Sequence, residues 1–298
     1  MADDNLSDDL TDNLTDNFDD ELGGGSAKKP SFRKPYADLD VTFQILMQTP
    51  EFVAIHKPPG YHVHQPEDPR HRADREFICL NNLRNQLDMY LYPVHRLDVG
   101  TEGVLLFALT KAAASGLAGQ FQNRHVKKTY FAITRGWAED EGEVAVTLDL
   151  DSTGEPVDCF TRYRTHQRVE LPFEIGKQHK TSRYSLVEAK PETGRFHQIR
   201  RHMARLSHPI IGDSSHGDSH HNKYFRQVLE EPGLWLKAKV VEFHNPVTGD
   251  PVRIESDWTP RWHRIFNKLG LKIPSANDDR LTARFTHDTT EENSDHDE

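Results

Sequence analysis

The chain has 298 residues, of which 35% are hydrophobic and 28% charged, and its formal net charge is −10. This length allows one or two domains with a sizeable core. No run approaches the ~20 apolar residues that cross a bilayer, the N-terminus lacks the features of a secretory signal, and Cys79 and Cys159 form neither a disulfide framework nor a metal-type pair. We expect a cytoplasmic protein with no membrane contact.

The negative charge is concentrated at the two ends of the chain. Residues 1–25 contain nine acidic residues and no Lys or Arg, and residues 275–298 contain eight acidic residues and two Arg. Removing these contributions of −9 and −6 leaves +5 for the segment between them. A mildly basic body suits a polyanionic partner, although the total charge taken alone argues against one.

Three regions are expected along the chain. Residues 1–40 are predicted to be a disordered acidic tail and linker, because in the first 22 residues one apolar residue in four cannot offset the chain entropy at this charge density, and a flexible Gly-Gly-Gly-Ser joint follows at 23–26. The alternative is a short acidic helix that docks on a basic cleft of the same chain. Residues 41–270 carry a globular pattern, and residues 271–298 are predicted to be a second disordered acidic tail.

The globular region begins with two strands, Val41–Met47 and Phe52–Ile55, and a turn at Lys57-Pro58-Pro59-Gly60. Leucines at helical spacing predict a helix over about 77–90, and an apolar run predicts a buried strand at Val104–Leu109. The later elements are a helix at 111–124, strands at 129–134, 143–150, 183–189 and 234–243, and helices at 196–206, 221–230 and 260–269. Because strands and helices do not alternate regularly, an α+β fold is favoured over a doubly wound sheet.

The first candidate site is the segment His95–Gly103, directly before the buried strand. Its Asp98 is a carboxylate on a glycine-flanked loop, where a rigid scaffold can present it to a cleft. The structural alternative is an aspartate that pairs with Arg96 or caps a turn.

The second candidate is the strand that begins with Lys127 and Lys128. With a period of two, Tyr130 lies on the opposite face of the strand from Phe131. Tyr130 can therefore face a site while Phe131 faces the core, although a tyrosine simply packed on a half-buried sheet is the structural alternative.

The third candidate is the helix predicted over 196–206. At about 100° per residue its apolar stripe consists of Ile199, Met203 and Leu206. The opposite row, suited to phosphates or to plain solvent, consists of His197, Arg201 and Arg205. Arg195 and His202 fall on the apolar side, and an inward arginine is costly unless it meets a carboxylate or a ligand. A loop aspartate would serve as that partner.

The fourth candidate is the histidine-rich segment 208–221. A metal site could use His216, His220 and His221 together with Asp213 or Asp218. This spacing matches no familiar zinc signature, and the interspersed glycines and serines favour a hydrogen-bonding loop of neutral histidines. We expect no metal here.

Taken together, these segments resemble the RluA-type pseudouridine synthases over roughly residues 43–263. The resemblance is carried, in the order found in that family, by Lys57-Pro58-Pro59-Gly60, His95-Arg96-Leu97-Asp98, Lys128-Thr129-Tyr130, Thr193-Gly194-Arg195-Phe196-His197-Gln198-Ile199-Arg200 and His208-Pro209-Ile210-Ile211-Gly212-Asp213. It implies a central mixed, mostly antiparallel sheet with flanking helices around a basic cleft, and an RNA uridine isomerase that uses no cofactor.

The resemblance also implies roles for individual residues. Asp98 would be the essential carboxylate, which attacks the anomeric carbon, adds to the uracil ring or removes a sugar proton. Arg195 would keep it ionised, Tyr130 would stack on the target base, and Arg96 would fill the space left by an extruded uridine. Contacts to the RNA are expected from His95, Lys127, Lys128, His197, Arg201 and Arg205.

Within the family, the sequence is most similar to the branch that modifies uridine 65 in the T-stem of tRNA. The pointers to this branch are Arg200-Arg201-His202 and the segment 212–218, in which His216 stands where many relatives have a tyrosine. One residue departs from the usual pattern, since Glu102 stands where a serine is usual. A ribosomal RNA or another tRNA position remains the alternative substrate. A non-catalytic RNA-binding module and a metal-dependent hydrolase are the rival classes. We expect a monomer.

Overall fold

The computed structural model describes residues 42–66, 72–149, 156–175 and 179–274. Its strands are β1 Gln44–Gln48, β2 Phe52–Lys57, β3 Tyr92–Pro93, β4 Glu102–Ala108, β5 Lys127–Arg135, β6 Glu141–Asp149, β7 Pro156–Leu171, β8 Ser182–Pro191, β9 Leu236–His244 and β10 Pro251–Glu255. Its helices are α2 Cys79–Leu87, preceded by the 3-10 turn η2 Arg75–Phe77, and α3 Lys111–Gln122, α4 Gln198–Arg205, α5 Ser219–Gln227 and α6 Pro260–Leu269.

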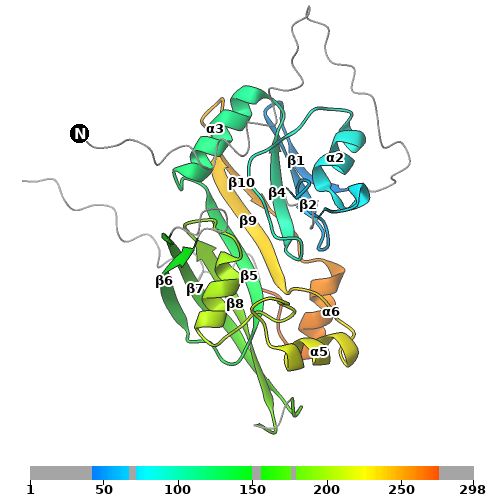
Figure 1. Cartoon of the computed structure of the whole chain (residues 1–298), viewed down its shortest axis with the longest axis vertical. Helices are drawn as coiled ribbons and strands as arrows, with labels where there is room; N and C mark the ends of the chain where they lie inside the picture. Colours follow the sequence, from blue (N-terminus) through cyan, green and yellow to red (C-terminus); the bar gives the residue numbers. More distant parts are fainter. Residues whose placement is uncertain (1–41, 67–71, 150–155, 176–178, 275–298) are drawn as a thin grey trace, which may run out of the picture.

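One sheet runs through the described residues (Figure 1). Its strand order is β1-β2-β4-β9-β5-β8-β7-β6, with β10 beside β9 and β3 beside β4. β4 and β9 are parallel, and every other pair of neighbouring strands in this part of the chain is antiparallel. The expected α+β fold with a mixed, mostly antiparallel sheet is confirmed.

Helices pack on both halves of the sheet. In Figure 1, α2 and α3 lie beside the half of the sheet that contains β1, β2 and β4, and α5 and α6 lie together at the lower right of the view. The apolar core follows this division, since buried residues of β2 and β4 pack with α3, and buried residues of β5 and β8 pack with α5 and α6. The two halves join where β4 pairs with β9, which is also where the chain leaves the Asp98 segment.

The local sequence explains why these helices begin and end where they do. The alanine-rich α3 is capped by Thr110, whose side chain accepts a hydrogen bond from the Ala113 backbone. α6 starts with Pro260 and ends at Gly270, which adopts a left-handed conformation. No helix in the described segments is long and apolar enough to span a membrane.

Most predicted elements are present, with three differences. The strands β3, β7 and β10 were not expected, the helix predicted over about 77–90 is confined to Cys79–Leu87, and the helix predicted from residue 196 begins at Gln198. The predicted acidic tails lie outside the described residues, except for the first four residues of the C-terminal one.

Candidate active site

Asp98 lies in the loop between β3 and β4 and is held there by its neighbours. Leu97 is buried and packs into a core cluster with Leu105 of β4, while the Asp98 side chain remains 19% exposed. At Gly103 the strands β4 and β9 approach so closely that a Cβ atom would come 2.0 Å from the Ala238 carbonyl oxygen, and φ is +122°. Only glycine fits this position, which fixes the end of the loop to the sheet.

The turn at Lys57 anchors the same loop from the other side. The buried Lys57 ammonium donates hydrogen bonds to the carbonyl oxygens of Val99 (3.1 Å) and Thr101 (2.8 Å). The Gly60 backbone N–H donates to the Val99 carbonyl at 2.8 Å. Burial lowers the pKa of Lys57 to about 8. The Lys-Pro-Pro-Gly segment, which sequence analysis identified as a turn and as one of the family's motifs, therefore holds the backbone that directly follows Asp98.

Arg200 of α4 connects Asp98 to a second carboxylate. Its Nη1 lies 3.2 Å from Asp98 Oδ2, while Nε and Nη2 donate to the two carboxylate oxygens of Asp213 at 2.8 and 2.6 Å. Burial by itself would lower the pKa of Arg200, but the two carboxylates raise it overall. A bidentate pair of this kind fixes the plane of the guanidinium and aims the remaining nitrogen at Asp98.

Arg195 does not occupy the predicted place beside Asp98. His197 has a left-handed backbone (φ 54°) and precedes the first residue of α4, so Arg195 lies outside the helix and its projection onto the apolar side does not apply. The backbone N–H of Arg195 donates to the Gln198 side chain at 3.1 Å. Among the described contacts, the guanidinium that meets Asp98 belongs to Arg200.

Sequence analysis missed Arg200 because the helical projection places it at the border of the apolar stripe, about 100° from Ile199. An arginine at the edge of an apolar helix face needs a carboxylate partner, and this requirement could have pointed to Arg200. Its partners, Asp98 and Asp213, come from two distant segments.

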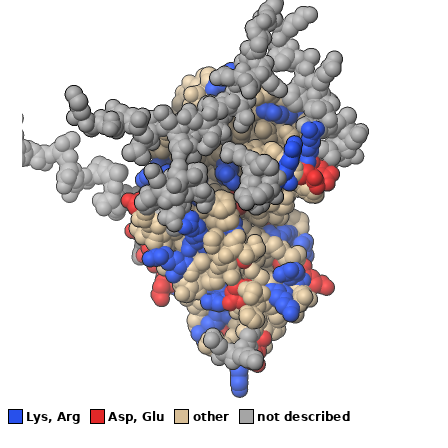
Figure 2. Space-filling model, in the orientation of Figure 1, with Lys and Arg blue, Asp and Glu red and all other residues tan. Residues whose placement is uncertain are grey.

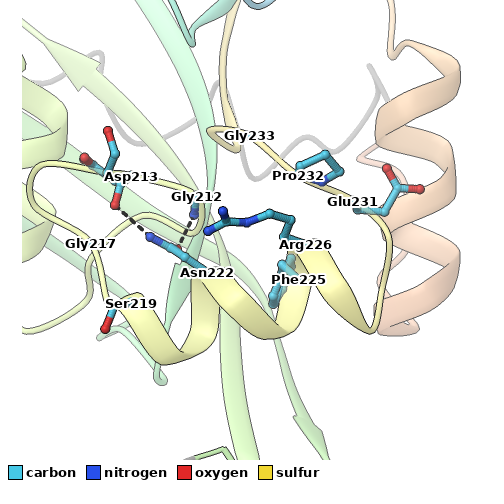
Figure 3. Close-up of a pocket in the computed structure, with 11 residues that line it drawn as sticks. Gly212, Asp213, Gly217, Ser219, Asn222, Phe225, Arg226, Glu231, Pro232 and Gly233 are labelled. Carbon is cyan, nitrogen blue, oxygen red and sulfur yellow. Dashed lines mark hydrogen bonds between the residues drawn. The ribbon is translucent and has the colours of Figure 1, made fainter.

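Asp213 is held by a turn packed against α5 (Figure 3). The Asn222 side chain accepts a hydrogen bond from the Gly212 backbone at 2.6 Å and donates to the Asp213 carbonyl at 2.8 Å. A Cβ atom at Gly212 would come 1.8 Å from the Gly233 carbonyl oxygen, so this close approach requires glycine. A cavity of about 490 Å³ lies here, lined by the turn, by α5 and by the segment that contains Pro232 and Gly233.

Tyr130 lies on β5 with the predicted orientation. Tyr130 and Ala132 pack in one cluster with residues of α4, while Phe131 and Ile133 pack on the other face with α5 and α6. Burial raises the pKa of Tyr130, and the negative charge of Asp98 raises it further. The phenol is therefore protonated at neutral pH, which favours a stacking role over a role as general base.

His197 faces the site and not the solvent. Its Nε2 lies 3.9 Å from Asp98 Oδ2, and its Nδ1 lies 3.2 Å from His216 Nε2. Burial lowers the pKa of His197 to about 4, so the ring is neutral at pH 7. The prediction that His197, Arg201 and Arg205 face away from the core is thus wrong for His197. It agrees with the exposed Arg205 and the half-buried Arg201.

His95 has an internal role, in contrast to the predicted contact with RNA. Its Nε2 accepts a hydrogen bond from the Leu106 backbone at 3.0 Å, and its ring stacks on Phe121 at 4.6 Å. Burial lowers the pKa of His95 to about 3, so the ring carries no charge that would attract a phosphate. The residue supports the segment in front of Asp98.

The two lysines of β5 that were predicted to contact RNA differ in how accessible they are. Lys127 is exposed, whereas the half-buried Lys128 donates to the Thr193 carbonyl at 3.0 Å. Burial lowers the pKa of Lys128 to about 8. Figure 2 shows basic side chains in several groups on the visible lower part of this face, with acidic side chains between them.

The histidine-rich segment spreads its side chains over different partners. His216 contacts His197, His221 Nδ1 lies 3.0 Å from the Tyr184 hydroxyl, and His220 is exposed. Asp218 caps α5 by accepting hydrogen bonds from the backbone of the two residues that follow Ser219. Within the described segments, no three potential metal ligands gather at one point.

Glu102, where a serine was expected from the resemblance, is buried behind the Asp98 loop. Its carboxylate meets Lys237 Nζ at 3.1 Å, the Thr259 hydroxyl at 3.2 Å and Arg261 Nη1 at 3.5 Å. Glu102 is 1% exposed and Lys237 is fully buried. The residue contributes to the support of the loop through β4 and β9.

Comparison with known proteins identifies the family. A sequence model described as RNA pseudouridylate synthase matches residues 51–205, a range that includes Asp98, Tyr130 and Arg200. The chain belongs to the RNA pseudouridylate synthase family. It is therefore a pseudouridine synthase, an isomerase, and the resemblance stated from its motifs is confirmed.

Relatives with curated names cover most of this pseudouridine synthase. The protein "tRNA pseudouridine synthase C" of Vibrio vulnificus is 40% identical over 236 residues, which are 76% of this chain and 95% of that protein. The protein of the same name from Vibrio cholerae is 39% identical over 237 residues, covering 76% of this chain and 96% of the relative.

Two solved human structures share the fold. "RNA Pseudouridylate Synthase Domain Containing 4" aligns with a TM-score of 0.58 at 22% identity, over 78% of this chain and 95% of that one. "RNA Pseudouridylate Synthase Domain Containing 1" aligns with a TM-score of 0.57 at 22% identity, over 74% and 86%. At this identity the likeness supports the architecture of the sheet and helices.

Proposed function

We propose that this pseudouridine synthase converts uridine 65 in the T-stem of tRNA to pseudouridine, with Asp98 as the essential carboxylate. The observation that carries the proposal is the cluster of Asp98, Arg200 and Asp213, in which a partly exposed carboxylate is held by a guanidinium that a second carboxylate fixes. The substrate is inferred from relatives named tRNA pseudouridine synthase C, which the chain covers almost completely.

The reaction breaks the bond between N1 of uracil and C1′ of ribose and forms a bond between C5 and C1′, while C5 loses a proton and N1 gains one. Asp98 attacks C1′, adds to the uracil ring or removes a sugar proton, and all three routes need an ionised carboxylate. Arg200 donates to Asp98 Oδ2 and compensates its charge, while Asp213 keeps the guanidinium in place. This is the role that sequence analysis assigned to Arg195.

The other residues of the site bind and position the RNA. A uridine inside a stem must be extruded at a cost of a few kcal/mol before Asp98 can reach it. Tyr130, protonated and half-buried beside Asp98, stacks on the extruded base, and the exposed Arg96 fills the space left in the stem. Lys127, Lys128, Arg201 and Arg205 contact phosphates, which makes binding salt-dependent.

The protein is proposed to act in the cytoplasm as a monomer, with residues 41–270 as the catalytic domain and no cofactor. Light scattering of the purified full chain, alone and with tRNA, tests the oligomeric state. An active dimer with no active monomer would contradict this part of the proposal.

The test of the function compares the wild type with Asp98→Asn on an unmodified tRNA transcript. Pseudouridine is mapped by mass spectrometry after carbodiimide labelling, and tRNA affinity is measured separately. We expect modification at position 65 by the wild type, none by Asp98→Asn, and tRNA affinity within about 3-fold between the two.

Each other outcome has a defined meaning. Turnover by purified Asp98→Asn refutes the role of the aspartate. Modification at another tRNA position, or of ribosomal RNA alone, keeps the chemistry and refutes the substrate. Binding without isomerisation of any RNA would favour a non-catalytic module.

A further inference from the structure

Phe196 is a large apolar side chain exposed beside the Asp98 cluster. It is 45% exposed and directly precedes His197, whose Nε2 lies 3.9 Å from Asp98 Oδ2. Val99, the residue after Asp98, is 37% exposed. Scattered apolar side chains on a surface need no ligand, but these two directly neighbour His197 and Asp98, whose side chains lie 3.9 Å apart. A ligand with apolar faces would cover them.

The ring of Phe196 is held in place by the site. It stacks on the imidazole of His197, with ring centroids 3.7 Å apart and planes at 18°. His197 has the left-handed backbone that is rare for a residue with a Cβ atom, and its Nδ1 is 3.2 Å from His216 Nε2. Phe196 is therefore backed by a ring whose own position is fixed, and 45% of its surface is exposed to solvent.

Arg96 borders Phe196 without packing closely on it. Its guanidinium carbon lies 5.9 Å from the centroid of the Phe196 ring. Other arginine–aromatic pairs in the described segments are closer, at 4.2 Å for Arg183 and Trp137. Arg96 is exposed, so its cation can also contact the π face or the phosphate of a ligand on Phe196.

We propose that Phe196, backed by His197 and bordered by Arg96, forms a stacking subsite for one nucleobase next to the target uridine. The identity of the ligand rests on the proposed function. Unstacked bases bind to aromatic side chains through their faces, largely independently of sequence. Extruding a uridine removes the stacking partner of the bases on both sides of it; Arg96 fills the space that the uridine leaves, and Phe196 beside it supplies an aromatic face for one of these bases. The subsite contributes affinity and position, and takes no part in proton transfer.

The test uses three substitutions at Phe196 and a matched control. Phe196→Ala lowers kcat/KM for tRNA about 10-fold, mainly through KM, because a base–aromatic stack is lost. Phe196→Trp retains the wild-type value, and Phe196→Leu falls between the two. Trp137 is the matched control because it is an aromatic residue of similar exposure, 42%, that also lies next to an arginine, Arg183. It follows the C-terminal end of β5, whereas Tyr130 lies nearer the start of that strand. Trp137→Ala leaves kcat/KM within about 2-fold of wild type.

Two further measurements separate stacking from structure and from the proposed function. Thermal unfolding of the four variants shows whether the fold is intact. In the Asp98→Asn background, a fluorescent adenine analogue placed next to the target uridine reports stacking on Phe196 directly, without turnover. If the wild type does not modify tRNA but the signal and affinity depend on Phe196, the proposed function fails and the subsite stands.

The subsite is refuted if folded Phe196→Ala keeps kcat/KM and RNA affinity within about 2-fold of the wild type. It is also refuted if Phe196→Leu equals Phe196→Trp in both measurements, because apolar bulk alone would then account for the effect.

Discussion

Removing the charge of Glu102 should destabilise the fold strongly. Its carboxylate lies 3.1 Å from Lys237 Nζ and 3.5 Å from Arg261 Nη1, and neither Glu102 nor Lys237 is open to solvent. Glu102→Gln keeps the side-chain volume and one oxygen, which can still accept from Thr259 and Lys237, but it removes the negative charge that pairs with the buried ammonium and replaces the oxygen that faces Arg261 with an amide NH2 group. Breaking a buried ion pair by removing one partner costs about 3–5 kcal/mol.

The size of this effect can be measured by urea unfolding at pH 7 and by thermal unfolding. For a domain of this size, 1 kcal/mol shifts Tm by about 2–4 °C, so a fall of about 6–20 °C is expected. Glu143→Gln is the control, because the Glu143–Arg162 pair is 2.9 Å apart but its side chains are 57% and 43% exposed. Such a pair contributes less than about 1 kcal/mol. A Glu102→Gln variant as stable as Glu143→Gln would refute the reasoning.

The loss of unfolding free energy caused by Glu102→Gln should also depend on pH. Burial lowers the pKa of Lys237 to about 8 in the folded protein, below its value of about 10.5 in an unfolded chain. Between these values the unfolded chain binds more protons, so the contribution of Lys237 to the unfolding free energy rises with pH. Losing the Glu102 charge lowers the folded pKa further. The difference in unfolding free energy between variant and wild type is therefore largest below the folded pKa of the variant, narrows as the pH rises towards 8, and stays constant above it.

Three further predictions concern activity. Arg200→Lys should lower kcat at least about 100-fold with little change in tRNA affinity, because the bidentate pair with Asp213 is lost; single-turnover rates within a few-fold of wild type would contradict this. Tyr130→Phe should retain activity within about 10-fold, and its pH–rate profile should match that of the wild type up to pH 9, because the raised pKa of Tyr130 keeps the phenol protonated over this range. If the substitution removes a basic limb from the profile, this prediction is wrong. Deleting residues 1–25 should not reduce kcat/KM for tRNA, measured on the purified truncated chain, and a large loss would show that the acidic segment has a positive function.

Local sequence was sufficient where one element carries its own signal. The apolar run before Leu109 predicted β4, and alternation along β5 placed Tyr130 and Phe131 on opposite faces. β7 was missed because its sequence is mixed and largely polar. That strand is held by its neighbours β6 and β8, which no local pattern reveals.

The sequence by itself determined the family, the α+β class and the loop that carries Asp98, because these depend on ordered motifs and on periodicity within single segments. Only the tertiary structure decided that Arg200 and not Arg195 meets Asp98, that His95 is internal, and that Glu102 pairs with Lys237. Each of these contacts joins residues from separate segments. Because α4 begins at Gln198 and not at residue 196, Arg195 lies outside the helix and the direction projected for its side chain does not apply.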